Sequence, residues 1–482
     1  MPFTDLRFLL LFLPITVGVY QLLPKQLRLW FIVLASLVYF WLNQPFYVCF
    51  FVAYSLINFG LGILLQKVLQ KKHYSEFVLC IALLFNLILL FCLKFIVENP
   101  SRIPNIFVVN LVKSEPLPTA WIFPLGFSYL VFQVIAYFLD IKNEITPAEK
   151  NPLKFAGFLL FFPKSIVGPI QRYRDSTDEL DFSSGTIDRT AEGIRRFIRG
   201  LAKKVLIADV LAKFINPVFT QTELSITTLQ AWLVLIGYAI QLFYDFSGYT
   251  DMAIGMGETF GIKMVENFNW PYISENVTDF WRRWHISLSS WFRDYVFIPL
   301  QFRFRKQKKY PIQVSILLVF LLTGIWHGLD WHYIAWGLML GIIIGFEATK
   351  LGKSKQKVWQ PLQHLWTIFW ILLSWVLFRS PSMGFAMNYY RALFGLQGET
   401  TPLPFSQTIP FPIVENSVLI AYIAGIFFAV PFIPWIKSRS KSKKVTPLFM
   451  RILRDIGLVL ILIYCLGLIA ASGPMPGIYG QF

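Results

Sequence analysis

Long apolar runs recur from one end of this chain to the other, and they limit its fold more than any other feature. Examples are "LRFLLLFLPITVGVYQLL" at 6–23, "FVLCIALLFNLILLFCL" at 77–93 and "IGLVLILIYCLGLIA" at 456–470. Such runs approach the roughly 20 residues that a helix needs to cross the hydrocarbon core of a bilayer. They lack the alternation of apolar and polar residues shown by the strands of a membrane β-barrel. The sequence therefore predicts an all-α polytopic integral membrane protein.

Charged residues are few, and the basic ones are unevenly placed. They make up 15% of the chain, whereas a soluble domain averages about a quarter. The net charge is +17, but the bases gather in short connectors rather than along one face, which argues against nucleic acid as a partner. This positive-inside pattern predicts the phospholipid bilayer, with its anionic headgroups, as the partner. The connectors lie at 25–28, 67–72, 302–309, 350–357 and 437–444.

Placing these connectors in the cytoplasm puts the N-terminus outside and predicts a multi-pass protein. We expect about 11–12 transmembrane helices, all within a single domain over 1–482. The predicted spans are 6–23, 28–44, 46–66, 76–97, 119–140, 228–247, 312–329, 332–349, 362–379, 416–436 and 449–472.

Two intervals are unlike ordinary spans. The first, 189–215, repeats apolar residues at helical spacing with arginines and lysines between them, which predicts an amphipathic helix in the cytoplasmic interface. The second, 244–300, carries polar and ionised residues throughout and is punctuated by glycine and proline. Irregular backbone at membrane depth must be covered by protein or reached by water. This interval therefore predicts short, broken or re-entrant helices that line an internal cavity.

Two of the five histidines lie where an ionisable side chain is costly. His327 follows the apolar run "LLVFLLTGIW", and its neighbour Gly328 would let a substrate approach the ring closely. His285 lies in "DFWRRWHISLSSWFRDY", where an interfacial aromatic belt would explain the tryptophans but not the interleaved charges. An intramembrane ionisable residue is by default a functional-site hypothesis. Burial favours the neutral imidazole, which can act as a general base toward a hydroxyl group.

The remaining histidines and motifs point elsewhere. We expect His332 to make a structural hydrogen bond, His364 to lie at the membrane interface and His73 to be solvated. His327 and His332 are five residues apart, or about 140° around a helix, so they do not form a metal-binding pair. The sequence holds no H-E-x-x-H, no Cys/His array and no G-x-S-x-G. It therefore predicts a base and a cavity, without a metal and without a nucleophile of its own.

Four stretches in this order carry a family resemblance. They are "FFPKSIVGPIQRY" (161–173), "YDFSGYTDMAIGMGETFGIKMVENFNWPY" (244–272), "DFWRRWHISLSSWFRDYVFIPL" (279–300) and "TGIWHGLDWHYIAWG" (323–337). Together they resemble the membrane-bound O-acyltransferases, above all the bacterial branch that acetylates polysaccharides such as alginate. That branch is related to the one that D-alanylates teichoic acids. The resemblance covers nearly the whole chain, with 244–337 as its catalytic core segment.

This resemblance implies helices that surround a central tunnel, with His327 of the family's W-H-G motif as the active histidine and His285 as a second catalytic position. The acyl group would arrive as a cytoplasmic thioester, on acetyl-CoA or an acyl carrier protein, without a permanently bound cofactor. It would pass to a hydroxyl acceptor on the outer side, by general-base catalysis or through an acyl-histidine. The substrate-binding candidates are Asp245, Asn267, Trp281, Arg282, Arg283, Trp284 and Trp326.

The resemblance further implies an O-acetyltransferase for cell-surface polysaccharide in a bacterial inner membrane. Its expected partners are an extracytoplasmic serine-hydrolase-like acetyltransferase and, for a protein-bound donor, a cytoplasmic acyl carrier protein. One alternative is D-alanyl transfer from a carrier protein to teichoic acid. The others are a transporter of acylated carrier or lipid and a non-catalytic scaffold of an export complex. These last two explain the hydropathy but not the ordered set of motifs.

Overall fold

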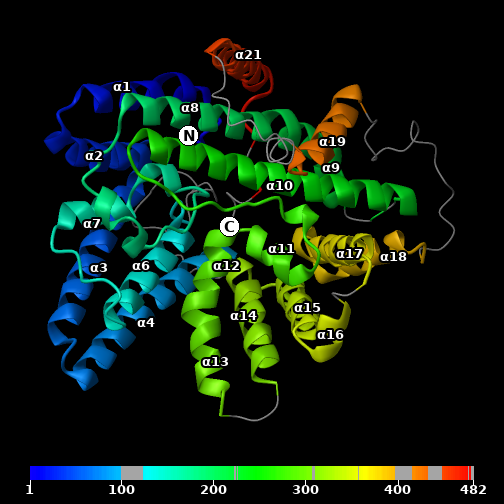
Figure 1. Ribbon diagram of the computed structural model, residues 1–482, viewed down its shortest axis with the longest axis horizontal. Helices are drawn as coiled ribbons and strands as arrows, with labels where there is room; N and C mark the ends of the chain where they lie inside the picture. The colour runs from blue at the N-terminus through cyan, green and yellow to red at the C-terminus, as the bar shows by residue number, and fades with distance from the viewer. Residues whose placement is uncertain are drawn as a thin grey trace, which may run out of the picture. The chain divides into compact units, whose positions relative to one another are not determined.

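The computed structural model describes residues 1–98, 123–221, 224, 226–306, 310–355, 358–396, 415–432, 448–475 and 477–478. Within these ranges the chain is built from helices, which Figure 1 shows in order along the chain. The only pairing of extended backbone there is an isolated bridge between Phe268 and Trp284. The predicted all-α class is confirmed.

The chain divides into two compact units. Unit 1 comprises Met1–Phe197 and Met252–Val265, and unit 2 comprises Ile198–Asp251 and Glu266–Phe482. Two helices, α8 (Ile187–Ala202) and α10 (Thr228–Thr259), contribute residues to both units. The single domain over 1–482 stays a prediction.

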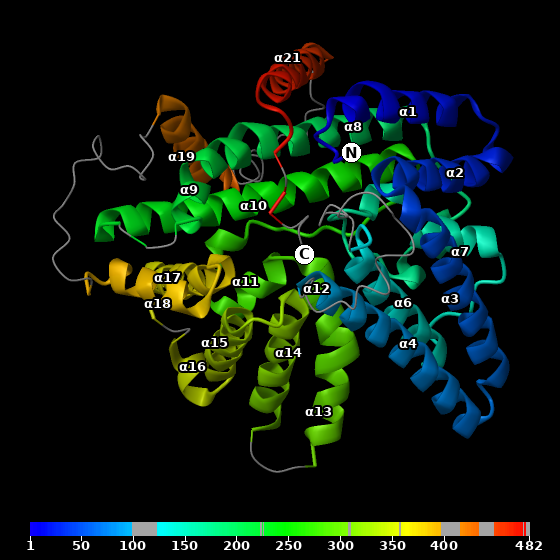
Figure 2. The ribbon, with the colours of Figure 1, turned by 180° about the vertical axis from the view of Figure 1, so that it is seen from behind.

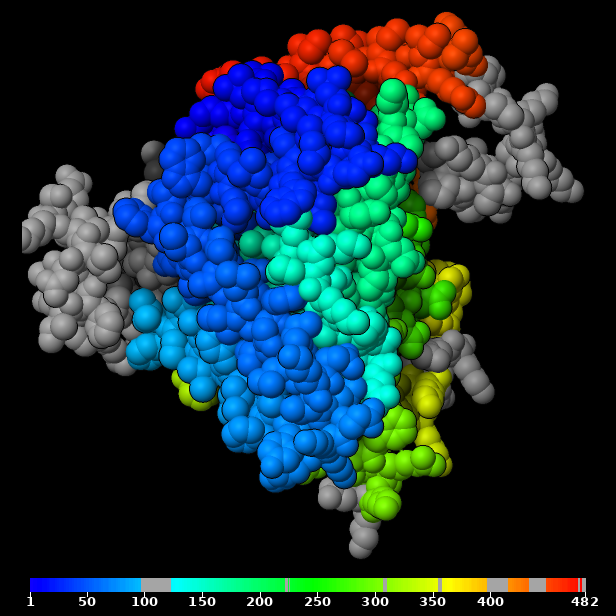
Figure 3. All heavy atoms as spheres, turned by 90° about the vertical axis from the view of Figure 1, so that its left-hand side faces the viewer, coloured from blue at the N-terminus to red at the C-terminus, as the bar shows by residue number. Residues whose placement is uncertain are grey.

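Unit 1 is made mainly of apolar helices that meet the molecular surface. α3 and α4 expose apolar side chains such as Leu56, Leu64, Phe77 and Ile88, as expected of helices that face lipid. Figure 3 shows both helices, in blue, at the surface. Besides parts of α8 and α10, the unit contains η1 (Phe8–Phe12), α1 (Leu13–Leu22), α2 (Lys25–Asn43), α3 (Val48–Val68), α4 (Lys72–Glu98), α6 (Phe127–Lys142) and α7 (Pro152–Leu159).

α6 is the internal helix of unit 1. Nearly all of its side chains are buried, and it packs against α3, α4 and α7, which surround it in Figure 2. It corresponds to the predicted span 119–140, whose first residues, 119–122, lie outside the described residues.

The interval 189–215 forms α8, a π-helical turn named η8 (Lys203–Ala208) and α9 (Asp209–Phe219) in direct succession. Apolar positions such as Leu201 are buried, as the amphipathic pattern predicts. One position differs from the prediction: Lys204, expected on the basic face, is buried. Lys204 turns inward because its ammonium pairs with two carboxylates, those of Asp209 and Asp245.

The interval 244–300, which was expected to be broken, is shared between the units, with Met252–Val265 in unit 1 and the rest in unit 2. The prediction of broken helices is wrong for 244–259, because α10 continues without a break to Thr259. Its glycines permit close packing instead, since a Cβ on Gly255 would lie 2.5 Å from the carbonyl oxygen of Gly193. After α10 the chain forms short helices separated by irregular backbone, which confirms short helices for 260–300; the cavity they were expected to line stays a prediction. The helices after α10 are η9 (Pro271–Ile273), α11 (Val277–Arg283), α12 (Ile286–Phe292), η10 (Arg293–Phe297), α13 (Ile298–Phe304), α14 (Pro311–His327), α15 (Trp331–Glu347), α16 (Lys350–Lys355), α17 (Gln360–Arg379), α18 (Met383–Leu393), α19 (Asn416–Phe428) and α21 (Leu448–Ser472).

In the described residues six helices are long and apolar enough to cross a membrane, and four shorter apolar stretches accompany them. Each predicted span overlaps one of these stretches or, for 119–140, α6. The chain is therefore a multi-pass membrane protein. The connector 437–444 lies outside the described residues, as do 307–309, 356–357 and 433–436.

Candidate active site

The predicted active histidine lies at the end of a tightly packed helical hairpin. α14 and α15 run side by side (Figure 1) and approach closely at glycines. A Cβ on Gly324 would lie 2.6 Å from the carbonyl oxygen of Tyr333, and one on Gly337 would lie 2.3 Å from that of Phe320. Small residues of this kind let membrane helices approach backbone to backbone. The "TGIWHGLDWHYIAWG" stretch thus forms a compact frame that holds His327.

His327 is the last residue of α14, and its side chain is enclosed by aromatic rings. The residue is 6% exposed. The ring of Trp336 stands perpendicular to the imidazole with centroids 5.2 Å apart, and Phe378 of α17 meets it edge-on at 5.0 Å. Trp326, the preceding residue, lies with its ring 4.5 Å away. The imidazole therefore sits in an apolar environment shielded from bulk water.

The turn after His327 is fixed by two contacts. A Cβ on Gly328 would lie 2.5 Å from the ring of Tyr333, so the close approach that this glycine permits is that of the tyrosine. The Nδ1 atom of His332 lies 3.0 Å from the carbonyl oxygen of Leu377. The structural hydrogen bond predicted for His332 is confirmed, and it ties the turn to α17.

His285 lies in a second buried turn, between α11 and α12. It is 1% exposed and has φ +46°, in the left-handed region that residues with a Cβ rarely adopt. Such strain persists where the surroundings enforce it. Here Asn267 does so, because its carbonyl oxygen accepts from the N–H of Ile286 at 3.0 Å and its Oδ1 accepts from the N–H of Ser287 at 3.0 Å.

The environment of the His285 ring is apolar. It meets Phe246 of α10 edge-on, with centroids 4.7 Å apart. This turn lies outside the membrane-spanning helices, and burial lowers the pKa of His285 to about 3. The ring is therefore neutral near pH 7 and can exchange a hydrogen bond or a proton with a neighbouring group.

Ring contacts connect the two histidine turns within unit 2. Trp284, next to His285, packs on Trp375 at 5.2 Å, and Trp375 packs on Phe378 at 5.7 Å. Phe378 in turn contacts His327. The two histidines thus flank one continuous apolar region. We name it the aromatic cluster; it consists of Trp281, Trp284, Trp336, Trp375 and Phe378.

Polar donors are buried in and beside the aromatic cluster. The indole N–H groups of Trp281 and Trp336 and the Nδ2 of Asn267 have no hydrogen-bond acceptor among the described residues. Trp336 contacts the His327 ring, and Trp281 contacts Trp336 at 5.8 Å. Buried donors nearly always have partners. These three donors are therefore free to bond a water; the contact of Asn267 and Trp281 with substrate stays a prediction.

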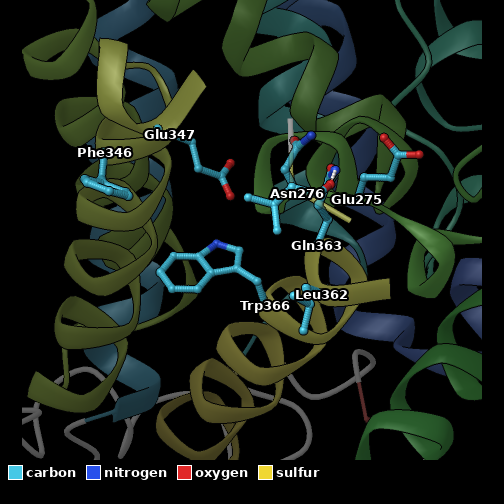
Figure 4. Close-up of a pocket in the computed structure, with 9 residues that line it drawn as sticks. Glu275, Asn276, Phe346, Glu347, Leu362, Gln363 and Trp366 are labelled. Carbon is cyan, nitrogen blue, oxygen red and sulfur yellow. Dashed lines mark hydrogen bonds between the residues drawn. The ribbon is translucent and has the colours of Figure 1, made fainter. Parts of the chain in front are cut away.

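A carboxylate from α15 anchors α11, which carries Trp281. Glu347 accepts from the backbone N–H groups of Val277 and Thr278, each at 2.9 Å, at the start of α11. Figure 4 shows this carboxylate beside a pocket. The pocket has a volume of 210 Å³, and its lining comes from α15, α16, α17, Val358 and residues 275–276. The pocket lies at the end of α15 opposite His327, a separation of about 24 Å along the helix. We therefore assign Glu347 a positioning role.

The charged candidates are placed differently from one another. Arg282 is exposed, and Arg283 forms an ion pair with Asp279 at 2.8 Å. Asp245 is buried on α10 and pairs with Lys204 at 2.6 Å. Asp245 and Arg283 are thus engaged within the protein, and their contact with substrate stays a prediction. Among the described residues, no group of three or more His, Cys, Asp or Glu side chains is placed to hold a metal.

Sequence reasoning missed three residues of this region. Glu347 carried a signal, because it is an acidic residue that ends the apolar run "GIIIGFE". Trp336 and Phe378 carried none. Aromatic residues are common in membrane helices, and only the packing of α15 and α17 brings these two rings to His327.

Comparison with known proteins assigns the chain to a family. Residues 147–376, which include both histidine turns, match the model of the membrane-bound O-acyltransferase family. The chain is also 34% identical over 453 residues to the probable alginate O-acetylase AlgI of Azotobacter vinelandii, a match that covers 93% of this chain and 90% of that protein. The chain belongs to the membrane-bound O-acyltransferase family.

Two other relatives bear names for different acceptors. The peptidoglycan O-acetyltransferase of Helicobacter pylori is 32% identical over 430 residues, covering 81% of this chain and 79% of the relative. The teichoic acid D-alanyltransferase of Bacillus subtilis is 32% identical over 319 residues, covering 63% of this chain and 76% of the relative. As a member of this family, the protein is an O-acyltransferase.

Proposed function

We propose that this O-acyltransferase moves an acetyl group from a cytoplasmic thioester across a bacterial inner membrane for O-acetylation of a cell-surface polysaccharide. Two relatives named for O-acetyl transfer match 93% and 81% of the chain, whereas the D-alanyltransferase matches 63%. The larger matched share of the chain for the O-acetyl relatives supports acetyl rather than D-alanine as the transferred group. D-alanyl transfer to teichoic acid is the second candidate.

The observation that carries this proposal is the His327 imidazole, buried against the aromatic cluster at the end of α14. The 17 residues of α14 span about 25 Å, against about 30 Å for the hydrocarbon core. The basic connector 302–309 favours a cytoplasmic start for α14. His327 would then lie inside the bilayer, close to its outer boundary. At this depth the His327 imidazole could be reached by an acceptor from the outer side and by a thioester from the inner side.

In the proposed reaction, a ring nitrogen of His327 takes the proton of the acceptor hydroxyl as its oxygen attacks the thioester carbonyl carbon. The negative charge that develops on the carbonyl oxygen is held by buried N–H donors, for which Trp336 and Asn267 are the candidates. The C–S bond then breaks, and the thiolate takes the proton from the imidazolium. In the alternative route the imidazole itself attacks and carries the acyl group.

The proposal includes the partners expected from the family. The donor is acetyl-CoA or an acyl carrier protein, drawn to the cytoplasmic surface by basic residues of α8 such as Arg195 and Arg199. An extracytoplasmic acetyltransferase of the serine-hydrolase type would complete transfer to the polymer. Neighbouring genes that encode such an enzyme would support acetylation, whereas a carrier protein with an adenylating ligase would support D-alanylation.

The test is acyl transfer by the purified protein in vesicles. With radiolabelled acetyl-CoA or acetyl carrier protein inside, and a soluble glycan together with the serine-hydrolase-type acetyltransferase outside, wild type should form labelled acetyl ester outside. His327→Ala should lower the rate by at least about 10²-fold, the smallest contribution expected of a general base. His73→Ala is the matched control, because His73 is exposed at the start of α4.

Two outcomes would contradict the proposal, and a third would invalidate the assay. Equal transfer by wild type and a folded His327→Ala protein would favour a transporter or a scaffold. Transfer of D-alanine from its carrier protein, without transfer of acetyl, would favour the second candidate. Loss of activity in His73→Ala as well would show that the assay reports folding rather than chemistry.

A further inference from the structure

A buried lysine in unit 1 is not explained by the acyl-transfer site. Lys164 belongs to the "FFPKSIVGPIQRY" stretch and lies in a short 3₁₀ helix, η5 (Phe162–Lys164), where it is 3% exposed. Among the described residues no carboxylate forms an ion pair with it. A buried ammonium without an opposite charge is costly. Its surroundings must therefore supply compensation from another source.

Burial lowers the pKa of Lys164 well below its usual range, whereas its direct contacts favour the charged ammonium but satisfy only part of it. Its Nζ donates one hydrogen bond, to Oε1 of Gln133. The same nitrogen lies 4.0 Å from the centroid of the Phe158 ring, whose face attracts a cation. An ammonium has three N–H donors. At least one N–H donor of Lys164 is therefore available for a partner other than Gln133 and Phe158.

A small cavity adjoins this ammonium. It has a volume of 10 Å³, and both Lys164 and Phe158 line it. Ser176, which is 3% exposed, lines it as well, and the hydroxyl of Ser176 has no hydrogen-bond partner among the described residues. Two buried polar side chains with unused hydrogen-bonding capacity therefore border one small, partly open cavity.

The lining offers donors rather than negative charge. Gln171 also borders the cavity, but its Oε1 already accepts from the N–H of Val265 at 3.2 Å. The remaining wall is apolar and comes from residues such as Leu180 and Met264. An ammonium and a hydroxyl group that can both donate, in an apolar shell, suit an anion better than a cation.

The size of the cavity limits what the anion can be. A volume of 10 Å³ corresponds to about one water-sized guest. A phosphate, sulfate or carboxylate group has several heavy atoms and does not fit. We propose that this cavity binds a single halide ion, chloride in the cell, which is held by the Lys164 ammonium and the Ser176 hydroxyl.

The test is the stability of the full-length protein in detergent as chloride replaces gluconate at constant ionic strength. An ion that binds only the folded state stabilises it in a saturable way. We expect the midpoint of thermal unfolding to rise by about 2–4 °C and then level off. Bromide should replace chloride. Lys164→Met should remove the response and Ser176→Ala should shift it to higher chloride concentration.

A variant of an exposed lysine serves as the control for this test. Lys150→Met removes an exposed lysine of the same unit and should keep the wild-type response. If Lys164→Met does not fold, two other measurements test the site. One is the chloride response of Ser176→Ala. The other is anomalous diffraction, which should show bromide within hydrogen-bond distance of Lys164 Nζ. No chloride response in wild type, an equal response in Lys164→Met, or no bromide at this position would each overturn the proposal. A neutral amine bonded to a water would give the first of these results.

Discussion

At the scale of single residues, the two catalytic candidates differ in how their surroundings hold them. His327 ends a regular helix and is enclosed by rings, whereas His285 occupies a left-handed backbone conformation enforced by Asn267. Strain of this kind costs about 1–3 kcal/mol and is found most often at functional sites. The His285 turn therefore has a local stability cost, and we expect it to be retained for function.

The buried His285 ring makes stability depend on pH. Its pKa is about 3 in the folded protein and about 6.5 in an unfolded chain. The unfolded state therefore binds the proton more readily, so stability is complete above pH 6.5 and falls as the pH drops toward 3. The loss should be about 1.4 kcal/mol per pH unit in that range. Denaturant unfolding in detergent between pH 7.5 and 5 measures it.

Two variants separate this contribution from general acid sensitivity. His285→Gln removes the titrating ring and should show a correspondingly smaller loss of stability below pH 6.5. His73→Gln removes an exposed histidine and should keep the wild-type dependence. If wild type and His285→Gln lose stability in parallel, the ring is not held neutral by the fold.

At the scale of elements, the α14–α15 hairpin and α11 depend on close contacts between them. Gly324 and Gly337 bring the two hairpin helices together, and Glu347 at the far end of α15 binds the start of α11. One helix, α15, thereby holds both the His327 turn and the helix that carries Trp281. A change that moves α15 should disturb both.

Two glycines of α15 provide a matched pair of variants. In Gly337→Ala the new Cβ would lie 2.3 Å from the backbone oxygen of Phe320, so α14 and α15 must separate. In Gly345→Ala the nearest atom is 3.8 Å away, an ordinary contact. We expect Gly337→Ala to lose about 1–3 kcal/mol, as overpacking does, together with transfer activity. Gly345→Ala should be neutral or stabilising by up to about 1 kcal/mol.

The midpoint of thermal unfolding and the rate of acyl transfer, each measured for Gly337→Ala and Gly345→Ala, test this prediction. Equal stability of the two variants would show that the hairpin tolerates separation at Gly337. A loss in Gly345→Ala of the same size would point to a general cost of substitution in α15 rather than to close packing.

At the scale of the whole molecule, the distribution of charge predicts the orientation in the membrane. The basic connectors place 67–72 in the cytoplasm and the α2–α3 turn, which includes Phe46, outside. Both sites are exposed to solvent or to the membrane surface. A membrane-impermeant reagent can therefore distinguish them.

Cysteine labelling in intact cells tests this orientation. In a chain whose four native cysteines are replaced, Phe46→Cys should react with an impermeant maleimide added outside. Lys71→Cys should react only after the membrane is permeabilised. Labelling of Lys71→Cys in intact cells would reverse the orientation and, with it, the side from which the thioester is expected.

Much of this architecture follows from the sequence alone. The length and apolar character of the runs determine the helices, because backbone groups in lipid must bond within their own segment. The polar interval 244–300 and the isolated histidines also show in the sequence, because ionisable groups in apolar surroundings are rare without a function. The sequence alone therefore identifies His327 and His285 as candidates.

The side chains that surround these histidines follow from the folded structure and cannot be predicted from the sequence. Trp336 and Phe378 reach His327 through the packing of α15 and α17, and Lys204 turns inward to meet Asp245 on another helix. The pattern of apolar and polar residues along one helix predicts which face of that helix a side chain occupies. It does not give the partner on a distant segment, because that contact depends on how close two backbones come, which glycines such as Gly324 and Gly337 set here.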